Sequence, residues 1–224
     1  FIRGNYIYNL HVIKKIKLFK QKYTDKGYFF KLWFQDNEKT SKKLDYNLNS
    51  NSVFFELGGY SGDYSEEIAS LFNPTIYIFE PDNEFFDKLV TRFKNNTKVN
   101  ILNFALSNKT ENLNLMKDGE SSSLHKVSNE RTVQVKGILL SNFIKENLIN
   151  KIDLLNMNIE GSEYVVLREM IKNGEINKIE SIQIQFHKNV RFYRVQRKLI
   201  HFYLKKTHKL IWSYDFVWER WDKI

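Results

Sequence analysis

The chain has 224 residues, a net charge of +9 and no cysteine. This length suits one domain with a sizeable core, and the lack of cysteine excludes disulfides, thiolate zinc sites and a cysteine nucleophile. No stretch approaches the roughly 18 apolar residues of a membrane span, and Lys14, Lys15 and Lys17 interrupt the only candidate signal-peptide core. We therefore expect a cytoplasmic protein. The chain begins with Phe1 rather than Met, which leaves open that it is a fragment of a longer protein.

The charge is unevenly spread along the chain. Residues 1–50 and residues 187–224 each carry +7, whereas residues 51–186 carry −5. Basic ends could steer an anionic acceptor, such as a sugar phosphate, a nucleotide sugar or nucleic acid. A composition rich in Asn, Lys and Ile gives basic surfaces by default, so charge alone does not identify the partner.

The first 50 residues are expected to form an N-terminal helical extension or a lid over a site. Apolar residues from Tyr8 to Phe19 recur at helical spacing, with lysines between them. A helix packed on the domain is the favoured interpretation, and a helix lying on a membrane surface is the alternative.

Residues 51–224 alternate short apolar runs with helical patterns, which is typical of one α/β domain. Strands are expected at Val53–Leu57, Ile76–Phe79, Val99–Asn103, Ile152–Met157 and Ile182–Phe186. Helices are expected after Gly62, Asp82 and Ser162 and near Leu140 and Val190, with Asp82 and Ser162 as N-caps.

Two further segments have a different period. Between about 111 and 138 the apolar residues alternate, which predicts a pair of strands inserted after the third core strand. Leu210–Trp212 and Phe216–Trp218 predict a closing antiparallel hairpin, with its turn at Ser213–Asp215.

A glycine-rich turn follows the first expected strand. The second expected strand is followed by Glu80, which carries a carboxylate, and then by Pro81. Glycines let backbone amides approach a ligand closely, because they lack a Cβ and accept positive φ. A carboxylate at the next strand end can accept hydrogen bonds from ribose hydroxyls. These motifs predict a site for a ligand with a ribose and an adenine. The glycine-rich turn does not have the Gly-x-Gly-x-x-Gly order that is typical of dinucleotide-binding proteins, so NAD is the weaker alternative as the ligand.

Two further motifs are Ala105-Leu106-Ser107, which is expected to close the third strand, and the run from Ile152 to Glu163, which contains Glu-Gly-Ser-Glu. Taken together, these motifs resemble the FkbM family of S-adenosylmethionine-dependent methyltransferases. The resemblance covers about residues 51–221. It implies a class I methyltransferase fold, a Rossmann-like, mostly parallel seven-stranded sheet with helices on both faces and a C-terminal antiparallel hairpin. It also implies S-adenosyl-L-methionine as the cofactor, without a metal. The implied cofactor-binding residues are Glu56, Gly58, Gly59, Tyr60, Ser61, Gly62, Glu80, Pro81, Ala105 and Asn158.

The loop after the fourth strand departs from the family pattern, because Asn156 and Asn158 replace its Lys and Asp. A carboxylate at the second position would lie beside the transferred methyl group, whereas asparagine can orient an acceptor but cannot take its proton. We interpret the joint change as compensated loss of a buried ion pair. Glu160 becomes the candidate acceptor-site carboxylate, and Glu163 is expected to cap the next helix.

His187 is expected to end the fifth strand, where family members often carry a histidine. At the ligand-binding edge of the sheet it could act as a general base, or it could be a hydrogen-bonded structural histidine. The candidate catalytic residues are therefore His187, Glu160 and Asn158. The other histidines have no metal-ligand spacing.

The resemblance implies O-methylation of a hydroxyl on a sugar, glycan or related small metabolite. Two alternatives remain. A nucleic-acid methyltransferase is favoured by the basic ends and by the aromatic residues between Arg191 and Arg194. A non-catalytic cofactor-binding module is favoured by Asn156 and Asn158.

Overall fold

The computed structural model describes residues 27–40, 42–118, 121–123 and 132–224. The chain divides into two compact units, residues 1–43 and 44–224. The described part of the first unit contains helix α2 (Tyr28–Thr40), and a short 3₁₀ turn, η1 (Lys42–Leu44), spans the boundary. The helix expected between Tyr8 and Phe19 lies outside the described residues. No helix within the described ranges has the length and apolar character needed to cross a bilayer.

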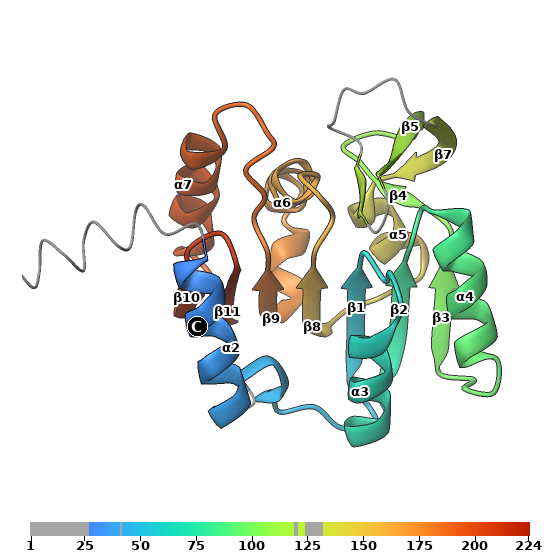
Figure 1. The fold of residues 1–224 in the computed structure, drawn as a ribbon, viewed down its shortest axis with the longest axis horizontal. Helices are drawn as coiled ribbons and strands as arrows, with labels where there is room; N and C mark the ends of the chain where they lie inside the picture. Colours follow the sequence, from blue (N-terminus) through green and yellow to red (C-terminus); the bar gives the residue numbers. More distant parts are fainter. Residues whose placement is uncertain (1–26, 41, 119–120, 124–131) are drawn as a thin grey trace, which may run out of the picture. The chain divides into compact units, whose positions relative to one another are not determined.

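The second unit is built on a seven-stranded sheet (Figure 1). Its order is β10 (His208–Tyr214), β11 (Trp218–Lys223), β9 (Ile179–Ile184), β8 (Ile152–Met157), β1 (Val53–Leu57), β2 (Thr75–Phe79) and β3 (Val99–Leu102). The pairs from β9 to β3 are parallel, and β11 runs antiparallel to both β9 and β10. The parallel strands all end at one edge, where α/β proteins bind their ligands.

Helices cover both faces of this sheet. α5 (Leu140–Glu146), α6 (Glu163–Lys172) and α7 (Tyr193–Leu204) pack with Phe55 and Leu155 in the larger apolar core. α3 (Asp63–Phe72) and α4 (Asn83–Phe93) pack with Phe54 and Leu154 in the second core. Neighbouring residues of β1 and β8 therefore face opposite layers, as the pleat of a strand buried on both faces requires.

A second, four-stranded sheet has the order β4 (Ala105–Leu106), β7 (Thr132–Ile138), β5 (Glu111–Asp118) and β6 (Ser121–Ser123). Its small core contains Ala105, Leu115 and Val135. The alternating residues of the sequence thus form antiparallel strands, with β5 and β7 paired from Glu111 to Met116. A 3₁₀ turn, η2 (Glu175–Lys178), links α6 to β9.

The α/β architecture with its seven-stranded sheet and C-terminal hairpin confirms the expected fold, and three boundaries and one helix cap differ from it. The hairpin turn lies at 215–217, because Tyr214 pairs with Trp218. β9 runs from Ile179 to Ile184, so His187 lies in the loop after the strand. Ala105 and Leu106 do not close β3 but form β4, parallel to β7. Asp82 caps α4 by accepting a hydrogen bond from the Glu84 amide, whereas the Ser162 side chain makes no cap hydrogen bond to the described residues of α6.

Candidate active site

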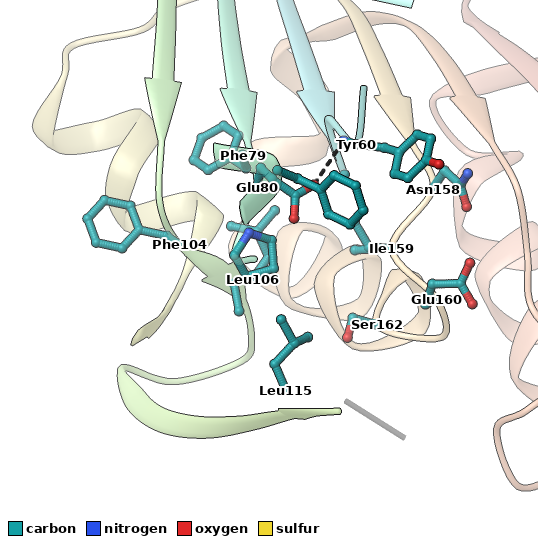
Figure 2. A pocket seen from close by; sticks show the side chains of 14 residues that line it. Tyr60, Phe79, Glu80, Phe104, Leu106, Leu115, Asn158, Ile159, Glu160 and Ser162 are labelled. Carbon is teal, nitrogen blue, oxygen red and sulfur yellow. Dashed lines mark hydrogen bonds between the residues drawn. The ribbon is translucent and has the colours of Figure 1, made fainter. Parts of the chain in front are cut away.

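A cavity opens at the carboxyl edge of the main sheet (Figure 2). Its lining comes from the segments that follow β1, β2 and β8, together with α4, β4 and β5. In Figure 2 the side chain of Glu80 lies on one side, and those of Asn158 and Glu160 lie on the other. The lining residues are Gly58, Tyr60, Phe79, Glu80, Pro81, Phe85, Phe104, Ala105, Leu106, Leu115, Asn158, Ile159, Glu160 and Ser162.

The turn after β1 brings two backbone segments into contact. Gly58 has φ +89°, and a Cβ there would lie 2.1 Å from the carbonyl oxygen of Asn158. The Gly58 amide donates to the carbonyl of Phe79 at 2.9 Å, and the Asn158 amide donates to the carbonyl of Leu57 at 3.0 Å. Only glycine combines that φ with that approach, so the residue type fixes how closely the β1 and β8 loops meet.

Glu80 is held by backbone amides at the end of β2. One carboxylate oxygen accepts from the Tyr60 amide and the other from the Asp82 amide, each at 2.9 Å. Burial raises the pKa of Glu80, although these hydrogen bonds oppose the shift. Each carboxylate oxygen has a second lone pair, so the anchored side chain can still accept hydrogen bonds from a ligand.

The Glu80 side of the cavity is apolar. Tyr60 has φ +44°, and its ring contacts Phe85 of α4 with 4.6 Å between centroids. Leu106 of β4 and Leu115 of β5 are buried and complete this lining. Flat apolar walls beside an anchored carboxylate suit a planar base attached to a polyhydroxylated sugar.

The loop after β8 has an unusual backbone. Glu160 has φ +51° and Gly161 has φ +110°, and the loop is secured by Asn189, whose side-chain amide donates to the Glu160 carbonyl at 2.9 Å. The side-chain oxygen of Asn158 is buried and has no hydrogen-bond partner among the described residues. A buried polar atom without a partner is costly, so this oxygen is suited to accept a hydrogen bond from a ligand donor.

His187 lies between two glutamates just outside the cavity lining. Its Nδ1 is 3.1 Å from a carboxylate oxygen of Glu163, and its Nε2 is 3.4 Å from one of Glu160. Burial alone would lower the pKa of His187, but the two carboxylates outweigh it and raise the pKa to about 9. Imidazole is therefore protonated at neutral pH, and its charge holds the Glu160 carboxylate in place.

Glu163 begins α6, and its carboxylate bonds to the loops beside the helix. Its side chain is fully buried and accepts from the amides of Gly161 at 2.8 Å and His187 at 2.6 Å. One carboxylate thus joins the loop after β8 to the loop after β9.

Glu56 lies away from the cavity lining, within a row of polar residues that crosses the sheet. Its register partner is Asn156, whose own partner is Gln183, and Gln183 donates to Asn156 at 3.1 Å and accepts from the Tyr46 hydroxyl at 2.7 Å. Burial raises the pKa of Glu56 to about 8, against a hydrogen bond from Ser65. With Asn156 in the place of the family's lysine, Glu56 has no cation beside it among its described neighbours.

The structure thus brings together seven of the candidate residues: Gly58, Tyr60, Glu80, Pro81, Ala105, Asn158 and Glu160. Five others lie outside the described lining: Glu56, Gly59, Ser61, Gly62 and His187. Gly59 and Gly62 serve packing instead, because a Cβ at either would press on Leu89 of α4. The Ser61 hydroxyl donates to Asp63.

Sequence reasoning did not predict seven of the lining residues as site residues. One is the polar Ser162, and the others are apolar: Phe79, Phe85, Phe104, Leu106, Leu115 and Ile159. Phe79 and Ile159 directly adjoin predicted residues, which is a usable signal. Leu115 lies on the inserted sheet, and only the folded chain brings it to the cavity.

The residues present fit S-adenosylmethionine. Gly58 lines the cavity with backbone alone, the Glu80 carboxylate is oriented for hydroxyl donors, and the Asn158 oxygen lacks a partner among the described residues. These features provide a backbone cradle, a ribose acceptor and a third polar contact around one cavity.

Comparison with solved structures gives distant similarities. A protein assigned as an rRNA methylase from Clostridium thermocellum aligns with a TM-score of 0.49 and 10% identity, over 84% of this chain and 96% of that one. A protein assigned as a methyltransferase from Streptococcus mutans, in complex with SAH, aligns with 0.47 and 12% identity, over 79% and 91%. Fibrillarin from Aeropyrum pernix with bound S-adenosyl-L-methionine aligns with 0.42 and 10% identity, over 78% and 67%. Similarities this distant carry no argument about the substrate.

Comparison of sequences identifies the family, which the distant structural similarities do not. No curated protein matches the chain, but residues 15–218 match the Methyltransferase FkbM domain. That match spans most of the 224 residues. The chain therefore belongs to the FkbM family and is an S-adenosylmethionine-dependent methyltransferase.

Proposed function

We propose that this methyltransferase acts on oxygen, at a hydroxyl of a sugar, a glycan or a related small metabolite. The observation that carries the proposal is that Glu80 and Glu160 line the same cavity. One carboxylate is anchored by backbone amides, and the other is paired with a histidine. Their separate roles would be cofactor binding and acceptor activation.

On the cofactor side, Glu80 would accept hydrogen bonds from the two ribose hydroxyls, and Phe104, Leu106 and Leu115 would contact the adenine. The β1 turn would place its backbone against the amino-acid end, because Gly58 lines the cavity without a side chain. The cofactor supplies a methyl carbon that is already electrophilic. The chain's own contribution is therefore chiefly alignment, which can supply much of the acceleration.

On the acceptor side, Glu160 would take the hydroxyl proton as the methyl group passes from the sulfur of the cofactor to the acceptor oxygen. His187 acts as a positioning residue, because its pKa of about 9 keeps it protonated and unable to accept a proton at neutral pH. Asn158 orients the acceptor through its unpartnered side-chain oxygen. A second hydroxyl of a sugar acceptor would satisfy that oxygen, because the reacting hydroxyl gives its single proton to Glu160.

The acceptor class is argued from charge and composition. The basic segments 1–50 and 187–224 favour an anionic acceptor, such as a sugar phosphate or a nucleotide sugar. The absence of cysteine from the sequence supports a reducing, cytoplasmic setting.

A transfer assay with methyl-labelled S-adenosylmethionine tests the proposal against a panel of nucleotide sugars, sugar phosphates and RNA oligonucleotides. Label in an alkali-stable ether on a sugar is the expected result. Label in RNA, on a base or on a ribose, would contradict it, and so would label in an amine or carboxylate of the panel.

Asn158 also supports a second candidate, a cofactor-binding module without catalysis, because asparagine cannot take a proton. The two functions separate in one experiment. A module would bind the cofactor and release no S-adenosylhomocysteine with any acceptor, whereas the proposed enzyme releases it in step with methylated product.

A further inference from the structure

Helix α7 exposes an apolar stripe. Val195, Leu199 and Phe202 lie at i, i+4 and i+7, so they share one face, and they are 57%, 51% and 60% exposed. The N-cap residue Phe192 is 65% exposed and extends the stripe. The opposite face is buried through Ile200 and Leu204, so α7 has an apolar face toward the core and a second one toward the outside.

Cations border this stripe. Arg194, Lys198 and Lys205 are exposed on the helix and follow the same side of it, and residues 188–209 contain eight Lys or Arg and no Asp or Glu. Lys206 lies 5.2 Å from the centroid of the Phe202 ring. A surface helix that combines a positive row with exposed aromatic and aliphatic residues has the composition of helices that lie in a membrane interface.

Four partners could cover the apolar stripe, and the charge of each partner decides which of them fits the cations beside it. The N-terminal segment 1–26 carries seven Lys or Arg and one Asp, so it would place like charge against α7. A second copy of the chain, docked by symmetry, would do the same. Nucleic acid would satisfy the cations, but Val195 and Leu199 cannot stack on bases as aromatic rings do. An anionic bilayer satisfies both the cations and the aliphatic side chains.

We infer that α7 docks the protein on an anionic lipid surface, with Phe192, Val195, Leu199 and Phe202 inserted among the headgroups and the cations paired with lipid phosphates. The loop between β9 and α7 spans residues 185–192 (Figure 1) and contains His187. Such docking would hold the enzyme beside membrane-bound acceptors, and we expect the acceptor to be a hydroxyl on a lipid-anchored glycan. This last step rests on the proposed function, whereas the docking itself does not.

Sedimentation of the full chain with vesicles tests the docking without cofactor or acceptor. We expect binding to phosphatidylglycerol vesicles that is at least about tenfold stronger than binding to phosphatidylcholine vesicles, because each cation near the surface adds attraction. Leu199→Glu and Phe202→Glu should each weaken it at least about tenfold, since they remove an inserted side chain and add like charge to the lipid. Leu71→Glu is the matched control, because Leu71 is 59% exposed on α3 and should leave binding unchanged.

The other occupants predict different results. Absence of vesicle binding, or equal loss with Leu71→Glu, would overturn the inference. So would tighter binding to a single-stranded RNA oligonucleotide than to vesicles, or a fall in Tm or in oligomer size with Leu199→Glu that indicates a protein cover. Retained S-adenosylmethionine binding in a chain that fails to bind vesicles would remove the docking and leave the proposed function standing.

Discussion

Gly58 and Asn158 meet backbone to backbone at the centre of the site, and a Cβ on Gly58 would lie 2.1 Å from the Asn158 carbonyl oxygen. The contact joins the β1 turn to the β8 loop, which hold the proposed cofactor and acceptor residues respectively. No side-chain rotation relieves a clash between a Cβ and a backbone carbonyl.

The first prediction concerns that contact. Gly58→Ala should lower the free energy of unfolding by about 2 kcal/mol or more, because alanine is strained at φ +89° and the two loops must separate. It should also abolish measurable S-adenosylmethionine binding. Chemical denaturation and titration calorimetry check the two effects. Gly174→Ala is the matched control, since Gly174 has φ +77° but its Cβ would meet nothing closer than 4.0 Å. If both variants lose the same free energy of unfolding, the positive φ alone would account for the loss, and the backbone contact would not contribute to it.

The second prediction separates the proton acceptor from its positioning residue. Glu160→Gln should lower kcat about 100-fold or more and leave the Kd of S-adenosylmethionine almost unchanged. The native rate should decline as pH rises through about 9, where His187 loses its proton and no longer holds Glu160. His187→Gln should lower kcat less and should lack that alkaline decline. An unchanged pH profile in His187→Gln would show that His187 does not act through its charge.

The third prediction is a rescue. Asn158→Asp in the Glu160→Gln background returns a carboxylate to the same cavity and should restore at least about tenfold of the lost rate. Asn158→Ala in that background is the control, because it removes the amide without adding a base. A rescue by both variants would mean that space rather than proton transfer limits the reaction.

The fourth prediction concerns Glu56. Its pKa is raised from 4.5 to about 8 by burial, so the folded protein holds a proton that the unfolded chain releases. The free energy of unfolding should therefore fall as pH rises from 4.5 to about 8 and level off above it. Glu56→Gln should remove this slope and stabilise the protein at pH 8 by on the order of a few kcal/mol. Parallel slopes in both proteins would show that Glu56 is not the titrating group.

The sequence predicted most of the main sheet because its signals are local. The run from Val53 to Leu57 is apolar, Gly58 follows it, and Asp82 precedes a helix that it does cap. The family resemblance likewise depends on short motifs around Gly58, Glu80 and Glu160.

The features that the sequence did not predict depend on contacts between segments that are far apart in the chain. The pairing of Tyr214 with Trp218 moves the hairpin turn, and the folding of β5 brings Leu115 to the cavity. The protonated state of His187 follows from two glutamates that come from a different loop. Spacing along the chain could suggest a histidine base, but only the folded geometry gives the pKa that argues against one.

Titration of the full chain with S-adenosylmethionine in a calorimeter, beside Glu80→Ala, tests the central claim most directly. The account predicts micromolar binding that Glu80→Ala weakens at least about tenfold, because the ribose loses its acceptor and the Tyr60 and Asp82 amides lose theirs. Glu84→Ala is a suitable control, since Glu84 lies nearby on α4 and pairs with Lys88 on the surface. Binding that is equally strong in Glu80→Ala, or absent in the native chain, would contradict the assignment of this cavity as the cofactor site.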